Sequence, residues 1–273
     1  MRDQRGIAHV IVFVLVLVLM SGLGFVAYQK LSRGQVDQKT SDNNSGAQES
    51  GGALWQWDGQ KWAASGNAPE CDDPVLVQSP TDVSKVSAIL YPGQTRGGNY
   101  KGHGGFRFEQ ADNKVEVTAP IDARLVEGSR YIEMGEVQNY FIFINDCGIA
   151  YKLDHLLTLT PKFQKIADTL PEAKPNDSRT TKLSTPVLIK AGEVIATEVG
   201  FKELNNVSFD FGLLDLRKEN GFTLSGNQSD PNFKQFNAYS LCWLDNLKDS
   251  ESGIVKALPA GDGQNGSTSD YCN

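Results

Sequence analysis

Residues 139–156 (NYFIFINDCGIAYKLDHL) give the strongest indication of the fold. Apolar and polar side chains alternate in the first half of this stretch and again in its second half, which is typical of β-strands that bury one face. Asn145, Asp146 and Gly148, near its middle, favour a tight turn. We therefore predict a β-hairpin whose turn carries Cys147.

The same alternation recurs on both sides of this hairpin. It is found in the runs KVEVTAP (residues 114–120), PVLI (residues 186–189) and SFDFGLLDL (residues 208–216), which are separated by segments containing Gly, Pro and Asn. Residues 86–220 are therefore predicted to form a mainly β domain.

One helix is expected to interrupt these strands. Thr160 stands where a helix cap is needed, and Pro161 at the first helical position has the backbone angle that a helix start requires. Apolar residues then recur at helical spacing up to Leu170. A second short helix is predicted at residues 238–247, within a loop-rich C-terminal extension, residues 221–273.

A single long apolar segment lies near the N-terminus. Residues 7–28 contain no charged side chain, and a helix needs about 20 apolar residues to cross a bilayer. No small-residue cleavage pattern follows, so we expect a retained transmembrane helix rather than a cleaved signal peptide. Residues 1–6 would form a short cytoplasmic end, and the polar residues 29–53 a flexible linker.

Residues 54–85 begin with a run that contains three of the four tryptophans. The Asp58-Gly59 pair within this run predicts a β-hairpin, and the rest of the segment leads into the β domain. The indole rings are expected to cover the main core. An aromatic platform for a glycan is the alternative interpretation.

All cysteines follow the apolar segment, namely Cys71, Cys147, Cys242 and Cys272. An even number of cysteines in an exported domain is typical of disulfide bonds. We therefore place the N-terminus in the cytoplasm and the domain outside the cell membrane, in a single-pass arrangement. Three pairings are possible. Cys242 and Cys272 bracket the C-terminal extension, which favours a bond between them and leaves Cys71 for Cys147.

The charge of the chain argues against a nucleic-acid partner. The formal net charge is −7 and the isoelectric point is near 5.1. Phosphate binding needs a concentrated basic surface, and no stripe of Lys and Arg is present. The membrane and a partner outside it are the interactions that the sequence favours.

Only two histidines, His103 and His155, follow the apolar segment. Histidine is the commonest metal ligand and the usual general base near neutral pH, so any zinc site or histidine-based catalysis in the domain must use these two. His103 lies in a glycine-rich turn, residues 97–108, and His155 at the end of a predicted strand. No Gly-Lys-Ser/Thr follows the glycines, which excludes a phosphate-binding P-loop.

Five motifs, in this order along the chain, resemble those of the M23 (LytM, lysostaphin-type) zinc peptidase domain. Residues 103–106 (HGGF) are similar to the first metal motif of that family, and residues 154–156 (DHL) to its catalytic strand. Residues 115–129 and 187–201 resemble two of its hairpins, and residues 208–215 fall where the family has His-x-His-Phe. The resemblance implies an M23-like β-sandwich of hairpins that meets cell-wall peptide.

The metal-binding residues of the family are only partly present. The resemblance implies that zinc would be held by the first-motif His, the Asp four residues later and the second His of His-x-His, with the strand His assisting catalysis. His103 and His155 are kept, but Arg107 replaces the Asp, and Ser208 and Asp210 replace the two histidines. Zinc needs about three neutral or anionic protein ligands, and arginine keeps its proton. We therefore expect no cofactor.

We predict that Arg107 and Asp210 form an ion pair across the vacated site, because a buried carboxylate needs a partner. With His103, His155 and Ser208 they would line a groove. The preferred function is a non-catalytic, membrane-anchored domain that binds cell-wall peptide (peptidoglycan) or regulates an envelope protein. In the alternative, His103 and Asp210 hold zinc, His155 assists catalysis, and the protein cleaves peptidoglycan crosslinks.

Overall fold

The computed structural model describes residues 52–222 and 234–272, which lie in one compact unit, Gly51–Asn273. The predicted cytoplasmic end, transmembrane helix and most of the linker lie outside the described residues. No helix in the two described ranges is long and apolar enough to cross a membrane.

Most of the described strands belong to one large sheet, so the prediction of a mainly β domain is confirmed. Its strands follow the order β11-β8-β9-β10-β14-β6-β3, while β12 also pairs with β8, β13 with β10 and β7, and β15 with β14. The bounds are β3 (Ala88–Leu90), β6 (Gly104–Phe108), β7 (Val117–Thr118), β8 (Ala123–Glu133), β9 (Glu136–Ile144), β10 (Ile149–Leu159), β11 (Lys174–Pro175), β12 (Thr181–Ile189), β13 (Val194–Val199), β14 (Val207–Asp215) and β15 (Ser240–Leu241).

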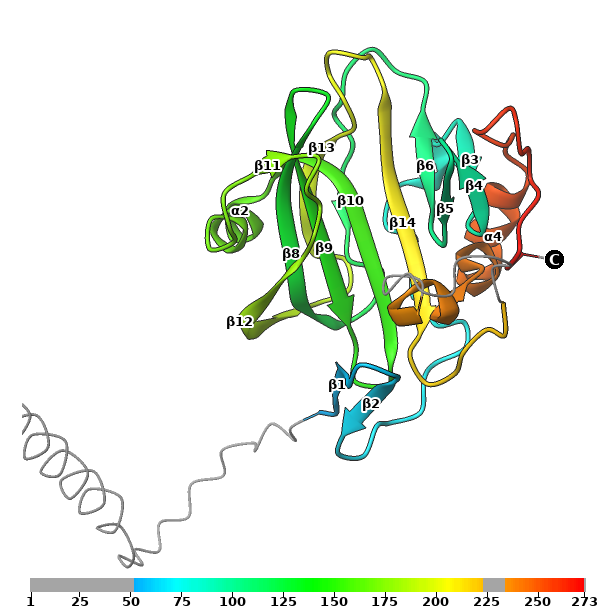
Figure 1. Ribbon diagram of the computed structural model, residues 1–273. Coiled ribbons are helices and arrows are strands. Elements are labelled where there is room, and N and C mark those ends of the chain that lie inside the picture. The colour runs from blue at the N-terminus through cyan, green and yellow to red at the C-terminus, as the bar shows by residue number, and fades with distance from the viewer. Residues whose placement is uncertain (1–51, 223–233, 273) are drawn as a thin grey trace, which may run out of the picture. The chain divides into compact units, whose positions relative to one another are not determined.

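Two small hairpins and two α-helices complete the described unit (Figure 1). The hairpins are β1 (Leu54–Trp57) with β2 (Trp62–Ser65), and β4 (Gln94–Arg96) with β5 (Asn99–Lys101). The helices are α2 (Pro161–Ala167), beside β8, and α4 (Asp249–Lys256), near β3 and β4 (Figure 1). Short 3₁₀ helices are η1 (Val83–Lys85), η2 (Asn237–Tyr239) and η3 (Trp243–Asn246). The predicted helix after Thr160 is therefore confirmed.

The tryptophan-rich hairpin covers part of the sheet, as expected. Trp62 is buried, and it packs with Trp55 and Trp57 against residues of β9, β10 and β14. The indole nitrogen of Trp55 donates to the carbonyl of Asp146 at 3.1 Å, and that of Trp62 donates to the carbonyl of Gln235 at 2.7 Å. Rings fixed in this way are part of the core rather than an open platform.

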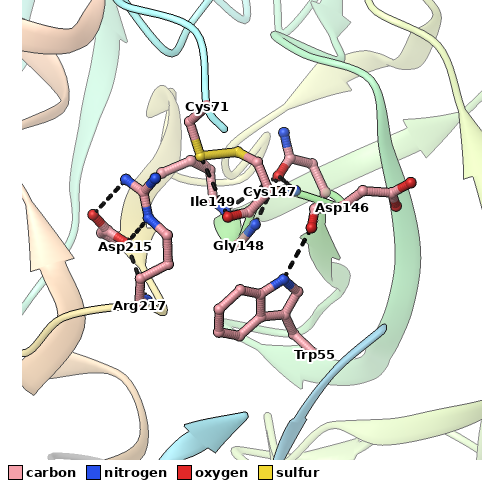
Figure 2. The surroundings of a disulfide bond; sticks show 9 residues. Trp55, Cys71, Asp146, Cys147, Gly148, Ile149, Asp215 and Arg217 are labelled. Atoms are coloured by element: carbon pink, nitrogen blue, oxygen red, sulfur yellow. Dashed lines mark hydrogen bonds and ion pairs between the residues drawn. A yellow bond between two sulfur atoms is a disulfide. The ribbon is translucent and has the colours of Figure 1, made fainter. Parts of the chain in front are cut away.

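The turn between β9 and β10 has the polar side chain that such a reversal needs. The Asn145 side-chain oxygen accepts hydrogen bonds from the backbone nitrogens of Cys147, Gly148 and Ile149. Gly148 has a φ of 99°, and a Cβ there would lie 2.6 Å from the Trp55 ring, so the position requires glycine. Figure 2 shows this turn with the indole beneath it.

Both disulfides form in the favoured pairing, Cys71 with Cys147 and Cys242 with Cys272. The first joins the segment after the tryptophan hairpin to the β9–β10 turn (Figure 2). The second ties the last described residues to the segment between η2 and η3. The C-terminal residues are also held by Gln94, whose amide donates to the carbonyls of Gly266 and Thr268.

The predicted helix at residues 238–247 is wrong. In its place Ser240–Leu241 pairs with β14 as β15, and the 3₁₀ helices η2 and η3 lie on either side. Cys242 has an extended backbone, with φ −70° and ψ 100°, which a continuous helix could not accommodate. The α-helix of this region, α4, begins later, at Asp249.

The core lies on one face of the sheet because side chains alternate along each strand. Phe209, Phe211 and Leu213 of β14 are fully buried there, and Phe106 and Trp243 pack against them. Figure 1 shows β8, β9, β10 and β14 side by side, so the residues between these apolar positions share the opposite face. That face carries the polar site described below.

The two disulfides are expected to contribute unequally to stability. They close loops with sequence separations of 76 and 30, and the chain-entropy account gives about 4.5 and about 3.6 kcal/mol for loops of these lengths. Chemical unfolding of Cys71→Ser/Cys147→Ser and of Cys242→Ser/Cys272→Ser should therefore show losses of this order, the first being larger. A loss below 1 kcal/mol in both (against an expected value of about 4) would contradict this estimate.

Candidate functional site

Strands β10 and β14 bring polar side chains together on the face opposite the core. In β14, Asp210 lies between the buried Phe209 and Phe211. Asp154 pairs with Asp210 across the two strands, and Lys152 pairs with Gly212. Two carboxylates and one ammonium therefore lie on the same face of neighbouring strands.

A cavity of about 560 Å³ lies over this polar face. Strands β8, β9, β10 and β14 contribute to its lining, together with residues 98–103 and residues 176–180. Its charged and aromatic lining residues are Tyr100, Lys101, His103, Tyr131, Glu133, Tyr140, Lys152, Asp154, His155, Arg179, Asp210 and Phe236. Three of the carboxylate and ammonium side chains, those of Lys152, Asp154 and Asp210, come from the two central strands.

A bulge in β10 directs two consecutive side chains to the cavity. Leu153 pairs with Phe141 and Leu156 with Asn139. The chain therefore advances three residues along β10 while it advances two along β9, so β10 contains one extra residue here. His155 takes the left-handed conformation, with a φ of 61°, which is unfavourable for a residue other than glycine. Such strain persists only where surrounding contacts hold it, and it is concentrated at functional sites.

His103 and Asp210 form the central hydrogen bond of the site. Nε2 of His103 lies 2.8 Å from Oδ2 of Asp210, and the two side chains are only 17% and 19% exposed. Burial, helped by the positive charges of Lys152 and Arg96, lowers the pKa of His103 to about 4. His103 is therefore neutral near pH 7 and donates its Nε2 proton, while Nδ1 is buried without a hydrogen-bond partner among the described residues.

Asp210 is ionised despite its burial. Burial alone would raise the pKa of Asp210, but His103, His155 and Arg96 together hold it well below its usual range. The guanidinium of Arg96 is fixed by hydrogen bonds to the carbonyls of Tyr91 at 2.6 Å and His103 at 2.8 Å. Asp210 thus has a neutral hydrogen-bond donor in His103, and the Arg96 guanidinium and the His155 imidazole also favour its charged form.

The second histidine lies among carboxylates. Nε2 of His155 is 3.6 Å from Asp210, and Nδ1 is 3.9 Å from Glu133 and 3.4 Å from the Tyr131 hydroxyl. Burial opposes protonation of His155, but Asp154, Asp210 and Glu133 outweigh it and raise its pKa. Asp154 is itself occupied, because it accepts hydrogen bonds from the Tyr131 hydroxyl at 2.8 Å and from the His155 backbone at 2.7 Å.

The structure brings His103, His155 and Asp210 into one cavity, but it does not bring Arg107 or Ser208 there. The predicted ion pair between Arg107 and Asp210 is not formed. Arg107 is exposed on β6, where it pairs with Ser208, whereas Asp210 pairs with Gly105. This two-residue offset, about 6.6 Å along a strand, separates the two charges, and Asp210 is compensated by His103 instead.

Two residues of the site, Arg96 and Lys152, were not predicted from the sequence. Lys152 had a usable signal, since it alternates with Asp154 on the polar side of a predicted strand. Arg96 had none, because its position beside Asp210 depends on the β4–β5 hairpin, which brings its guanidinium to the carbonyl of His103.

No group of three or more His, Cys, Asp or Glu side chains that could hold a metal ion is found in the described part of the chain. His103 and Asp210 are bonded directly to each other. Two cationic side chains, Arg96 and Lys152, are close enough to lower the pKa of His103. Positive charge at this position opposes the binding of a second cation.

Comparisons with known proteins do not establish a family for this chain. No family model and no curated protein matches the sequence. Among solved structures, the NMR solution structure of lysostaphin is similar, with 14% sequence identity and a TM-score of 0.32. The match covers 54% of this chain and 49% of that chain, so this chain spans about half of that structure. A likeness this distant leaves the function to be argued from the cavity.

The buried His103 should make the protein sensitive to mild acid. The pKa of His103 is lowered from 6.5 to about 4 on folding, so the unfolded chain takes up its proton first as the pH falls. Between pH 7 and pH 5 this linkage removes about 2 kcal/mol of unfolding free energy. Chemical unfolding at both pH values should show this loss in the wild type.

His103→Gln, which can still donate to Asp210, serves as the comparison. Its loss of stability between the two pH values should be smaller than that of the wild type by about 2 kcal/mol. The raised pKa of His155 changes the stability in the opposite direction, but it does so in both proteins. The difference between the two losses of stability therefore reports on His103. Equal losses in the two proteins would show that His103 is not buried in its neutral form.

Proposed function

We propose that this domain lies outside the cell membrane and uses the cavity to bind a peptide of the cell wall without cleaving it. The observation that carries the proposal is the direct His103–Asp210 hydrogen bond at the base of the cavity. The two groups that the motif resemblance would assign to zinc satisfy each other there. What remains is a cavity suited to holding a ligand.

The size and lining of the cavity suit a short peptide. Ligand sites of this kind measure about 300–1,000 Å³, and this cavity has about 560 Å³. Groups of both signs line it, together with the amide side chains of Asn99 and Asn176 and the hydroxyls of Ser178 and Thr180. Such groups can pair with the donors and acceptors of peptide bonds.

The cell wall as the source of the peptide is supported by the sequence. Five motifs in the order of the M23 family span residues 103–215, and that resemblance implies a groove that meets peptidoglycan. The two disulfides among described residues suit an oxidising compartment. Residues 7–28 would anchor the domain next to the wall, and residues 29–53 would give it reach.

The absence of zinc catalysis is part of the proposal. Arg107 takes the place of one implied ligand and is not among the residues that line the cavity, and Lys152 and Arg96 add positive charge beside the remaining two. Zinc would have to displace the His103–Asp210 hydrogen bond and accept that charge. The described site therefore does not suit zinc, although it contains three side chains that could bind the metal, His103, Asp210 and His155.

Retention on purified peptidoglycan sacculi tests the binding proposal. The full-length protein in detergent should sediment with sacculi. Asp210→Asn should sediment less, because the loss of its charge leaves His155 and Arg96 without their shared anion. Arg107→Gln is the matched control, since Arg107 is exposed outside the cavity and should leave retention unchanged. Wild-type protein that stays in solution would contradict the proposal.

A zymogram separates binding from cleavage. Neither the wild type nor His155→Ala should clear a peptidoglycan gel, with or without added zinc. Zinc-dependent clearing that His155→Ala abolishes would instead establish the alternative, a metallopeptidase in which His103 and Asp210 hold the metal.

A further inference from the structure

We propose that Lys152 binds the C-terminal carboxylate of a short peptide in the cavity. The inference rests on the proposed function and names the part of the ligand that the site recognises. It concerns a residue that has no counterpart among the motif positions discussed above. Its basis is a cationic side chain that faces the cavity and forms no ion pair with the residues that the structure describes.

The position of Lys152 is fixed by the sheet. Its neighbours in β10, Tyr151 and Leu153, are fully buried in the core, so Lys152 faces the cavity. Its side chain runs past Gly212 of β14, where a Cβ would lie 2.7 Å from Cε of Lys152. Glycine at this position leaves the space that the lysine stem occupies.

The ammonium of Lys152 lacks a protein anion. Its nitrogen forms no ion pair within 4.0 Å and no hydrogen bond with the residues that the structure describes; it lies 6.0 Å from the centre of the Phe236 ring. An ammonium has three donors, and leaving them unpaired in a partly buried site is unfavourable. Burial lowers the pKa of Lys152 to about 8, although Asp210 and Asp154 favour its charged form.

The carboxylates near Lys152 are already used by other groups. Asp210 accepts from His103 at 2.8 Å, and Asp154 accepts from the Tyr131 hydroxyl and from the His155 backbone. A second cation, Lys101 of β5, faces the same cavity and repels Lys152. Neither lysine forms an ion pair within the described part of the chain, which favours an anionic ligand between them.

A peptide end suits the site better than a small free anion. A lone carboxylate such as acetate would fill only a small part of about 560 Å³. The amides of Asn99 and Asn176 in the lining would meet the peptide groups next to the carboxylate. Acetate and a peptide end would each place a carboxylate against the Lys152 ammonium. We assign this carboxylate to the C-terminus of a peptide.

Isothermal titration calorimetry with two N-acetylated peptides that differ only at the C-terminus tests this assignment. N-acetyl-Ala-Ala-Ala with a free carboxylate and the same peptide with a C-terminal amide are titrated into the full-length protein in detergent. A hydrogen bond to a charged group contributes about 1.5–3 kcal/mol, so the acid should bind about tenfold or more tightly than the amide. Acetate serves as a third ligand and should bind more weakly than the acid peptide.

Lys152→Met keeps most of the stem and removes the charge, so it should lose the preference for the acid over the amide. Lys165→Met, on the exposed side of α2, is the control and should keep it. A thermal melt of each variant establishes that it is folded. The comparison of acid with amide in the wild type needs no variant and remains decisive if Lys152→Met fails to fold.

Equal binding of acid and amide by the wild type, no binding of the acid, or a preference that survives in Lys152→Met would each overturn the inference. Acetate binding as tightly as the peptide would overturn the assignment of a peptide end. Retention on sacculi without an acid preference leaves the proposed function intact and removes this inference. An acid preference without retention on sacculi would support the role of Lys152 and contradict the proposed function.

Discussion

The buried carboxylate of Asp210 is the constraint around which the cavity is arranged. A carboxylate removed from water is strongly unfavourable unless hydrogen bonds and opposite charges compensate for it. His103 donates to it at 2.8 Å, His155 lies 3.6 Å away, and Arg96 is held nearby by two backbone carbonyls. These contacts engage the groups that could otherwise serve a metal ion. They leave Lys152 as a positive group in the cavity that has no such partner among the described residues.

The two-residue period of the strands links this site to the core. In β14 the rings of Phe209 and Phe211 occupy the core face, and Asp210 between them occupies the other. A shift of one residue in the pairing of β14 with β10 would place Asp210 in the core and a phenylalanine in the cavity. The apolar packing therefore fixes the register, and the register positions the polar groups. The bulge at His155 adds one further polar side chain at the cost of a strained backbone.

The sequence was informative where local chemistry determines the structure. The β9–β10 turn was predictable because Asn145 and Gly148 satisfy its backbone, and α2 because Thr160 and Pro161 start it. Residues 238–247 were misread as a helix, since the pairing of Ser240–Leu241 with β14 and the disulfide at Cys242 are tertiary effects. The predicted partner of Asp210 was wrong for the same reason, because strand register decides which side chains meet.

We propose that the His103–Asp210 pair stands in place of a metal centre. The zinc content of the full-length protein, measured by inductively coupled plasma mass spectrometry after dialysis against zinc and then against metal-free buffer, tests it most directly. The account predicts zinc well below one ion per chain, with no further decrease in Asp210→Asn. One zinc per chain in the wild type, lost in Asp210→Asn, would contradict it.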